Sequence, residues 1–250
     1  MTGDPGFGGV VARMLESRGL SVSGLSHVFG IEEGELQTVL DGADPRLELV
    51  RRLASAFGLH LEDMLVIAGI DLPDDLKFLD PRARGWLRRL VSRTIRLRPT
   101  ALDELLRYVE SLPRELRTEP VPHVPARHHY EPGIGGVLLH MLHNRNLDWG
   151  DAAWMLGEAT DGRIYWSAST VGMVGAGRKE VTPELLVALA PVLGISPDDL
   201  SAVAGMDIPS ATPAAESNAF MMADVLWEAR SLTVDQVKKV YEKAESLSEG

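Results

Sequence analysis

Arginine side chains crowd one short segment of the chain, where they could bind phosphate. The segment from Asp80 to Thr100 has a single carboxylate, and its basic residues are Arg82, Arg84, Arg88, Arg89, Arg93, Arg96 and Arg98. Guanidinium groups form charge-assisted hydrogen bonds with phosphate oxygens. If the segment is helical, its apolar residues share one face, so the arginines on the other faces could lie along a phosphate backbone. The alternative is that they neutralise acidic residues of the same chain or of a second subunit.

Four histidines are close enough in sequence to suggest a metal site. His140 and His143 are three residues apart, and His128 and His129 lie upstream in a proline-rich stretch. Zinc sites need three or four ligands at firm spacing, which the proline-rich stretch does not supply, so we interpret these histidines as solvated. The chain has no cysteine, no phosphate-binding loop and no nucleophile beside a base. We therefore expect neither a cofactor nor an enzyme.

The composition is that of a soluble globular protein. Of the 250 residues, 45% are hydrophobic, and the mean hydropathy is close to zero. No apolar run is long enough to span a membrane, and Met1 to Gly9 lacks a secretion signal, so we expect a cytoplasmic protein. Few of the basic residues are lysine, which favours a GC-rich, bacterial coding sequence. The net charge is −11, and residues 1–75 carry an acidic excess whose field should repel phosphate.

The chain also repeats itself. Leu15 to Ser21 returns as Leu142 to Asp148, and Ala68 to Pro73 returns as Ala204 to Pro209. The offset between copies rises from 127 residues at Gly8 and Gly135 to 136 at Gly69 and Gly205, which indicates an insertion in the second copy, around residues 158–166. A repeat of this length predicts a duplicated domain.

Apolar residues recur at helical spacing throughout each copy, and no segment alternates with a period of two. Glycines and capping residues divide each copy into five short helices and a helical hairpin. The acid pairs Glu62-Asp63 and Asp198-Asp199 begin predicted helices, where capping explains them. We therefore predict an all-α fold with internal pseudo-two-fold symmetry. The expected units are 1–118 (module 8–73, hairpin 81–112), a proline-rich linker 119–132, and 133–250 (module 134–209, hairpin 218–247).

Both modules resemble a known family. The first copy carries the pattern Leu20-Ser21, Leu25-Ser26, Phe29-Gly30-Ile31, Leu36, Val39, Gly42 and Gly58-Leu59, and the second matches it at Leu147, Ala152, Leu156-Gly157, Val171, Val174, Gly177 and Gly194-Ile195. This pattern resembles the five-helix, helix-turn-helix module of phage-repressor-like (Cro/C1, XRE-type) DNA-binding proteins. The resemblance implies that the third helix of a module lies in the major groove of double-stranded DNA. It also implies a bacterial transcriptional regulator.

The second module has the surface that this function needs. Its third helix begins with hydroxyl residues, and basic residues follow it where family members touch the DNA backbone. The predicted DNA-binding residues are Arg163, Ser167, Ser169, Thr170, Arg178 and Lys179, together with Arg84, Arg88, Arg89 and Arg93 of the arginine segment. In the inserted turn, Arg163, Tyr165 and Trp166 could contact a groove. The alternative, which we favour, is that the two aromatic residues close the core.

The first module departs from the family pattern. Its third helix begins Ile31-Glu32-Glu33-Gly34-Glu35, which presents carboxylates where phosphates would lie. We expect this helix not to read DNA. Glu32, Glu33 and Glu35 are instead predicted to make protein contacts, either by folding back on Arg82 to Arg98 or by joining a second copy of the chain as a homodimer. The alternative function is therefore a protein-interaction or scaffold protein that kept the fold and does not read DNA.

Overall fold

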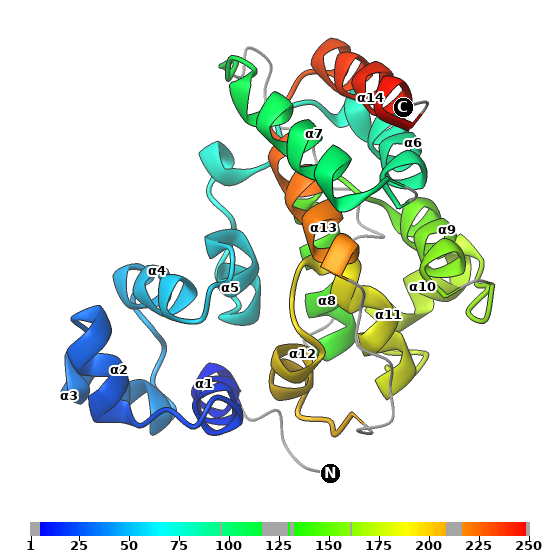
Figure 1. Cartoon of the computed structure of the whole chain (residues 1–250). Helices are drawn as coiled ribbons and strands as arrows, with labels where there is room; N and C mark the ends of the chain where they lie inside the picture. Colours follow the sequence, from blue (N-terminus) through cyan, green and yellow to red (C-terminus); the bar gives the residue numbers. More distant parts are fainter. Residues whose placement is uncertain are drawn as a thin grey trace.

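The computed structural model describes residues 6–95, 97–116, 130, 133–160, 162–208 and 217–248. Within these ranges the chain forms helices and no strand, which confirms the expectation of an all-α fold (Figure 1). The helices are α1 (Gly6–Ser17), α2 (Val22–Phe29), α3 (Glu33–Leu40), α4 (Leu47–Ala56), α5 (Leu61–Ile67), η1 (Asp74–Leu76), η2 (Pro81–Ala83), α6 (Arg84–Thr94), α7 (Pro99–Ser111), α8 (Ile134–Asn144), α9 (Trp149–Ala159), α10 (Ala168–Gly175), α11 (Pro183–Leu193), α12 (Pro197–Ala204), α13 (Ser217–Ala229) and α14 (Val234–Ser248). Of the expected linker 119–132, only Tyr130 belongs to the described residues.

Capping residues set many of these helix boundaries. The Ser21 side chain accepts a hydrogen bond from the Gly24 amide at the start of α2, and Ser196 does the same for Asp199 in α12. Gly30 and Gly194 end α2 and α11 in the left-handed conformation, which glycine adopts without steric cost. These short polar and glycine signals explain why several helices end within about three turns.

The hairpin helices differ slightly from their predicted bounds. The first hairpin helix was expected to begin at Pro81, but a 3₁₀ turn comes first and α6 starts at Arg84. Helix α7 begins at Pro99, since the amide that proline lacks would have no partner at the first helical position. A capping box begins α14, with the Thr233 amide donating to Gln236 Oε1 at 3.0 Å and the Gln236 amide donating to Thr233 Oγ1 at 3.4 Å.

Two groups of helices have the order expected of the repeat. We call α1–α5 the first module and α8–α12 the second module. In the first module, Gly8 of α1 lies directly against the Val39 carbonyl of α3, and in the second module Gly135 of α8 lies in the same way against the Val174 carbonyl of α10. A methyl group at either glycine would overlap that carbonyl oxygen. Glycine is therefore required where the two helices cross.

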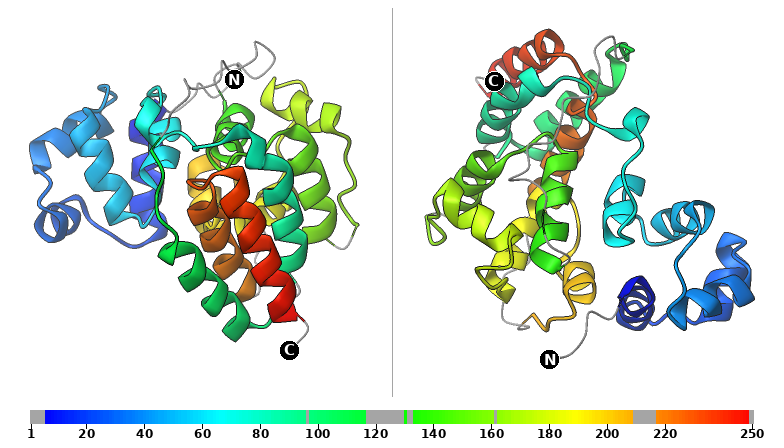
Figure 2. Two further views of the ribbon diagram at one scale, coloured as in Figure 1. Left: turned by 90° about the horizontal axis from the view of Figure 1, so that it is seen from above. Right: turned by 180° about the vertical axis from the view of Figure 1, so that it is seen from behind.

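The two halves of the chain are interleaved. Helix α1 packs against α12, and α8 packs against α5, so the first helix of each module contacts the last helix of the other. The hairpins combine in the same reciprocal way, with α6 against α14 and α7 against α13 (Figure 2). We call α6, α7, α13 and α14 the four-helix bundle. The two modules and their hairpins therefore share one continuous core instead of forming separate globular units.

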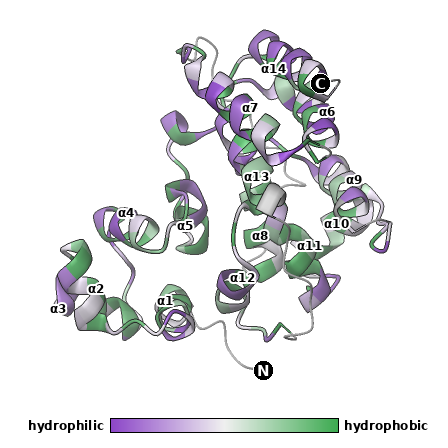
Figure 3. Cartoon of the chain, in the orientation of Figure 1, coloured by the Kyte–Doolittle hydropathy of each residue, from purple (hydrophilic) through white to green (hydrophobic). Residues whose placement is uncertain are grey.

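The modules sit differently relative to the four-helix bundle. The second module packs beneath the bundle through α11 against α13 and α9 against α6, whereas the first module lies to one side (Figures 1 and 2). Hydrophobic residues concentrate on α8 and α11, in the middle of the molecule (Figure 3). Among the described helices, none combines the length and the apolar character that crossing a membrane requires.

Candidate nucleic-acid interface

Helices α9 and α10 are the second and third helices of the second module. The ring of Trp149, at the start of α9, lies against Gly172 of α10, where a side-chain carbon would come within 2.8 Å of the ring. Trp149 Nε1 also donates a hydrogen bond to Tyr130 Oη at 2.5 Å. A residue larger than glycine at position 172 would therefore push the two helices apart.

The N-terminal end of α10 carries a cluster of hydroxyl groups. Ser167 caps the helix by accepting a hydrogen bond from the Thr170 amide at 3.2 Å. Its Oγ also lies 2.7 Å from Ser169 Oγ and 3.0 Å from Thr170 Oγ1. Ser167 and Ser169 are exposed and Thr170 is partly exposed. Since a hydroxyl both donates and accepts, this cluster can exchange its internal bonds for bonds to phosphates or base edges.

Two basic residues follow α10 in a tight turn. The backbone amides of Arg178 and Lys179 both donate to the Met173 carbonyl, at 2.8 and 3.1 Å. Arg178 is exposed, and the Lys179 ammonium lies 4.9 Å from the centre of the Trp166 ring. The turn therefore holds both residues close to the C-terminal end of α10.

The two aromatic residues of the inserted turn before α10 lie in different surroundings. Trp166 packs against the core, as expected of a structural residue. Tyr165 is 89% exposed, so the expectation that it closes the core is wrong. Arg163 is also exposed, and its Nε donates to the Thr160 carbonyl at 3.0 Å. Arg163 and Tyr165 thus extend the polar surface of α10 along the turn.

The arginines of α6 are engaged inside the molecule. Arg84 Nη1 lies 3.3 Å from Asp148 Oδ2, and Arg88 Nε lies 4.0 Å from Asp151 Oδ1, both at the start of α9. Arg93 pairs with Glu245 of α14 at 2.9 Å. The Arg89 guanidinium stacks 4.7 Å from the Trp86 ring centre. Arg96 lies outside the described residues. The partners of these arginines therefore belong to the second module and the bundle, and not to the acidic first module.

The acidic residues of α3 lie apart from these arginines. Glu32 and Glu33 are exposed and Glu35 is half-buried, and within the described part of the chain none of them forms an ion pair. Helix α3 packs against α1 and α2. The expectation that this acidic ridge folds back on Arg82 to Arg98 is therefore wrong for the described residues, because no ion pair joins α3 to that segment and Arg84, Arg88 and Arg93 pair with other carboxylates.

Two carboxylates at the start of α9 have shifted pKa values. Asp148 accepts hydrogen bonds from the Gly150 and Asp151 amides, and Asp151 Oδ2 accepts one from the Asp148 amide at 3.0 Å. Burial, and then the nearby Asp148 charge, raises the pKa of Asp151 to about 6. Burial opposes ionisation of Asp148 as well, but the amide hydrogen bonds and Arg84 lower its pKa overall. The second module therefore meets α6 through one ionised carboxylate and one that titrates near pH 6.

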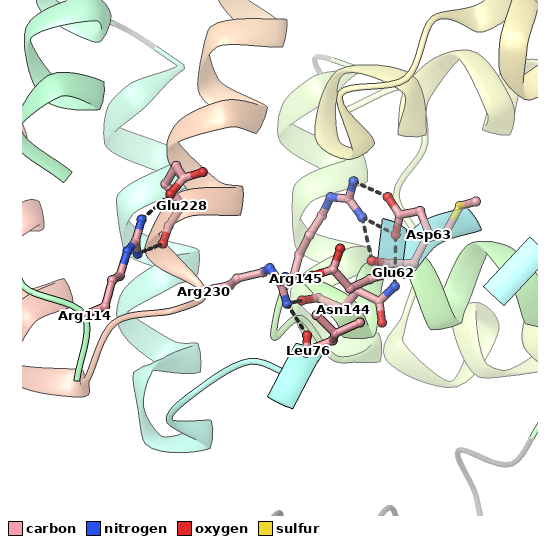
Figure 4. Close-up of polar contacts among 9 residues, drawn as sticks. Glu62, Asp63, Leu76, Arg114, Asn144, Arg145, Glu228 and Arg230 are labelled. Atoms are coloured by element: carbon pink, nitrogen blue, oxygen red, sulfur yellow. Dashed lines mark hydrogen bonds and ion pairs between the residues drawn. The ribbon is translucent and has the colours of Figure 1, made fainter. Parts of the chain in front are cut away.

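A buried ionic cluster that local sequence patterns do not indicate joins the two modules. Arg145, at the end of α8, pairs with Asp63 of α5 at 2.7 Å, and Asn144 Nδ2 donates to the same carboxylate at 3.0 Å (Figure 4). Arg230, just after α13, pairs with Glu62. Glu62 and Asp63 were interpreted as capping acids alone, which is incomplete, because arginines from two other helices bind them.

The same ion pair occurs at the opposite junction between the modules. Arg18, after α1, pairs with Asp199 of α12 at 2.9 Å. Each arginine also donates to a carbonyl near the end of helix four of its own module, Arg18 to Phe57 at 2.7 Å and Arg145 to Leu193 at 2.5 Å. The shared positions in the repeat could have revealed both pairs, because Arg18 and Arg145, like Asp63 and Asp199, occupy matching places.

Protein-family models, curated proteins and solved structures were all compared with the chain. None of them matches. The assignment of function therefore depends on the geometry of the chain itself. In the part that the structure describes, no group of three or more histidine and carboxylate side chains is placed to hold a metal ion. His140 and His143 line a cavity beside α8 and α9, whereas His128 and His129 lie outside the described residues.

Proposed function

We propose that this protein is a DNA-binding transcriptional regulator that contacts double-stranded DNA through its second module. The observation that carries the proposal is the exposed surface of α10, with hydroxyls at its start and basic residues just after its end. Hydroxyls at the start of a recognition helix can contact base edges or phosphates, and flanking arginine and lysine contact phosphates. The proposed contacts are Arg163, Ser167, Ser169, Thr170, Arg178 and Lys179.

The proposal assigns the two modules unequal roles. Where the second module has Arg178 and Lys179, the matching positions of the first module hold Ala43 and Asp44. The α3 carboxylates would repel phosphate at the place where α10 offers hydroxyls. Arg84, Arg88 and Arg93 contribute only to the extent that a phosphate displaces their internal carboxylates, so we assign them no leading role.

A binding selection from random duplexes, followed by fluorescence anisotropy, tests the proposal. Arg178→Glu with Lys179→Glu should raise the Kd by about 100-fold or more, because two attractive phosphate contacts become repulsive. The matched control is Arg107→Glu with Lys239→Glu, which makes the same charge change on exposed residues of the four-helix bundle. Equal losses in the two variants would show only a general effect of net charge. A wild-type chain that enriches no sequence would contradict DNA reading.

A second candidate function is protein interaction through the first module. Its support is the acidic ridge at the start of α3, where Glu32 and Glu33 are exposed and Glu35 is half-buried, shortly after the exposed apolar residues Val28 and Phe29. A ridge of this kind fits a basic protein surface with an apolar centre, and a second copy of this chain is one such partner.

Light scattering coupled to size exclusion tests the version with a second copy. If α3 joins two chains, then replacing Glu32, Glu33 and Glu35 by Lys should reduce the dimer to a monomer. The control changes Asp75, Glu115 and Glu242 to Lys, since these carboxylates are exposed and distant in sequence from α3. A wild-type chain that is monomeric at all concentrations would exclude the homodimer.

A further inference from the structure

A cavity of about 520 Å³ lies between the segment that follows α5 and helices α8 and α9. Gly69, Asp71 and Phe78 line one side, and His140, His143 and Trp149 line the other. This volume is in the range of small-molecule sites, which measure roughly 300–1,000 Å³. The cavity therefore has the size of a ligand site and is bounded by both modules.

The equivalent place at the opposite junction is filled by an arginine. Arg13 of α1 donates from Nε to the Ala202 carbonyl at 2.6 Å and from Nη2 to the Val203 carbonyl at 3.2 Å, at the end of α12. His140 occupies the position of Arg13 in the second copy of the repeat. The shorter imidazole leaves space where the guanidinium would extend.

The space around the glycines that follow α12 and α5 differs in the same way between the two junctions. A side-chain carbon at Gly205, after α12, would lie 3.3 Å from the Arg13 guanidinium. At Gly69, the matching residue after α5, it would meet no atom of the described residues within 4 Å. One junction is thus closed by a cationic side chain of the protein, and the residues that the structure describes leave the other open at the corresponding point.

The walls of the open junction suit a cation. Trp149 and Tyr130 are joined by a hydrogen bond, and the Tyr130 ring packs edge-on to His140 at 5.0 Å between ring centres. Aromatic rings attract cations placed over their faces. Asp71 is exposed and has no ion-pair partner among the described residues.

Two other charged groups of the wall are already engaged. The Lys77 ammonium is 2.7 Å from a carboxylate oxygen of Asp74. Asp148 caps α9 and pairs with Arg84. Among these three charged groups, Asp71 is therefore the one whose charge is available to a ligand.

We propose that this cavity binds a small organic cation, with a planar amidinium or guanidinium group on an aromatic or apolar body. Its charged group takes the place that the Arg13 guanidinium takes at the opposite junction. The ligand then contacts Asp71 of the first half of the chain and Trp149 of the second half together. This site is separate from the α10 surface and does not depend on DNA binding.

Isothermal titration of the full chain without DNA tests this site, with benzamidine as the probe. Benzamidine should bind with a Kd of about 1 mM or tighter, which corresponds to roughly 4 kcal/mol. Benzamide has nearly the same shape without the charge, and benzoate has the opposite charge, so both should bind at least about tenfold more weakly. Absence of benzamidine binding overturns the site. Equal affinities for the three probes overturn the assignment to a cation.

Two variants locate the bound probe. His140→Arg should fill the cavity as Arg13 fills its counterpart, so benzamidine affinity should fall by about tenfold or more. Asp71→Asn changes an exposed residue with little risk to folding, and it should weaken benzamidine by about tenfold while leaving benzamide unchanged. Asp44→Asn, at an exposed carboxylate of the first module, is the control and should bind as the wild type does. Wild-type affinity in a folded Asp71→Asn protein would place the probe elsewhere and overturn the proposal.

Discussion

Arg145 and Asp63 form a two-pronged ion pair in which both side chains are completely buried, with Nη1 to Oδ1 at 3.1 Å and Nη2 to Oδ2 at 2.7 Å. The matching pair, Arg18 with Asp199, is partly open to water, since the Arg18 side chain is 30% exposed. The difference follows from the four-helix bundle, because Trp227 of α13 stacks on Arg145 at 4.9 Å. One contact thus occurs twice in very different dielectric surroundings.

Loss of the Asp63 carboxylate should be far more damaging than loss of Asp199, whose partner Arg18 is partly exposed to water. Asp63→Ala leaves the buried Arg145 charge without its carboxylate, with only backbone carbonyls to accept its hydrogen bonds, and we expect the free energy of unfolding to fall by about 3–5 kcal/mol. Asp199→Ala leaves a hydrated arginine, and we expect a fall of about 1 kcal/mol. Urea denaturation of both variants measures the difference. Equal effects would show that burial of Arg145 is not what makes its pair important.

The helix crossings at Gly8 and Gly135 should reject a methyl group. Gly135→Ala places a carbon against the Val174 carbonyl, so the free energy of unfolding should fall by about 1–3 kcal/mol. Gly34→Ala is the control, because this exposed residue of α3 has open space around it. There, alanine should stabilise the helix by up to about 1 kcal/mol. Thermal unfolding of the two variants should shift in opposite directions, and a tolerated Gly135→Ala would contradict the close crossing.

His60 should make the fold less stable in acid. Its ring stacks on Trp227 with the ring centres 3.5 Å apart, and burial lowers its pKa to about 4. Because the folded state then binds fewer protons than the unfolded state, the contribution of His60 is complete above about pH 6.5 and falls as the pH drops toward 4. The expected loss is about 3 kcal/mol. His60→Phe keeps the stack, so the stability of the wild type relative to this variant should decrease across that range.

Asp151 should make the fold less stable as the pH rises, which is the opposite of the effect expected for His60. Because its pKa is raised to about 6, its charged form is disfavoured in the fold, and the wild type loses stability as the pH rises through 6. Asp151→Asn keeps an oxygen that can accept the Asp148 amide and removes the charge. Above pH 6 this variant should be more stable than the wild type, on the order of 1 kcal/mol, and the advantage should vanish near pH 4. A constant difference between the two proteins from pH 4 to 8 would exclude titration of Asp151.

The helix boundaries could be predicted from the sequence far better than the long-range ion pairs could. Local signals such as Thr233 with Gln236 are read within one turn, so the boundaries could be predicted closely. Whether Arg145 pairs with Asp199 of its own module or with Asp63 of the other could not be predicted, because the two carboxylates occupy matching positions of the repeat. For the same reason, the sequence did not reveal that Arg84 would meet Asp148, 64 residues away, instead of the acidic first module. Which carboxylate each arginine pairs with is determined by the tertiary packing of the helices.

The packing of α1 against α12 also bears on how the chain is assembled during synthesis. Helix α1 ends at Ser17 and α12 begins at Pro197, so the ribosome has made most of the protein before the first helix can reach its main partner. Contacts between segments so far apart are slow to form, since a long loop must close first. Until then the apolar face of α1, including Val11 and Met14, has only its own module to cover it. The amino-terminal helix of the nascent chain therefore completes its packing late, after the carboxy-terminal half has emerged.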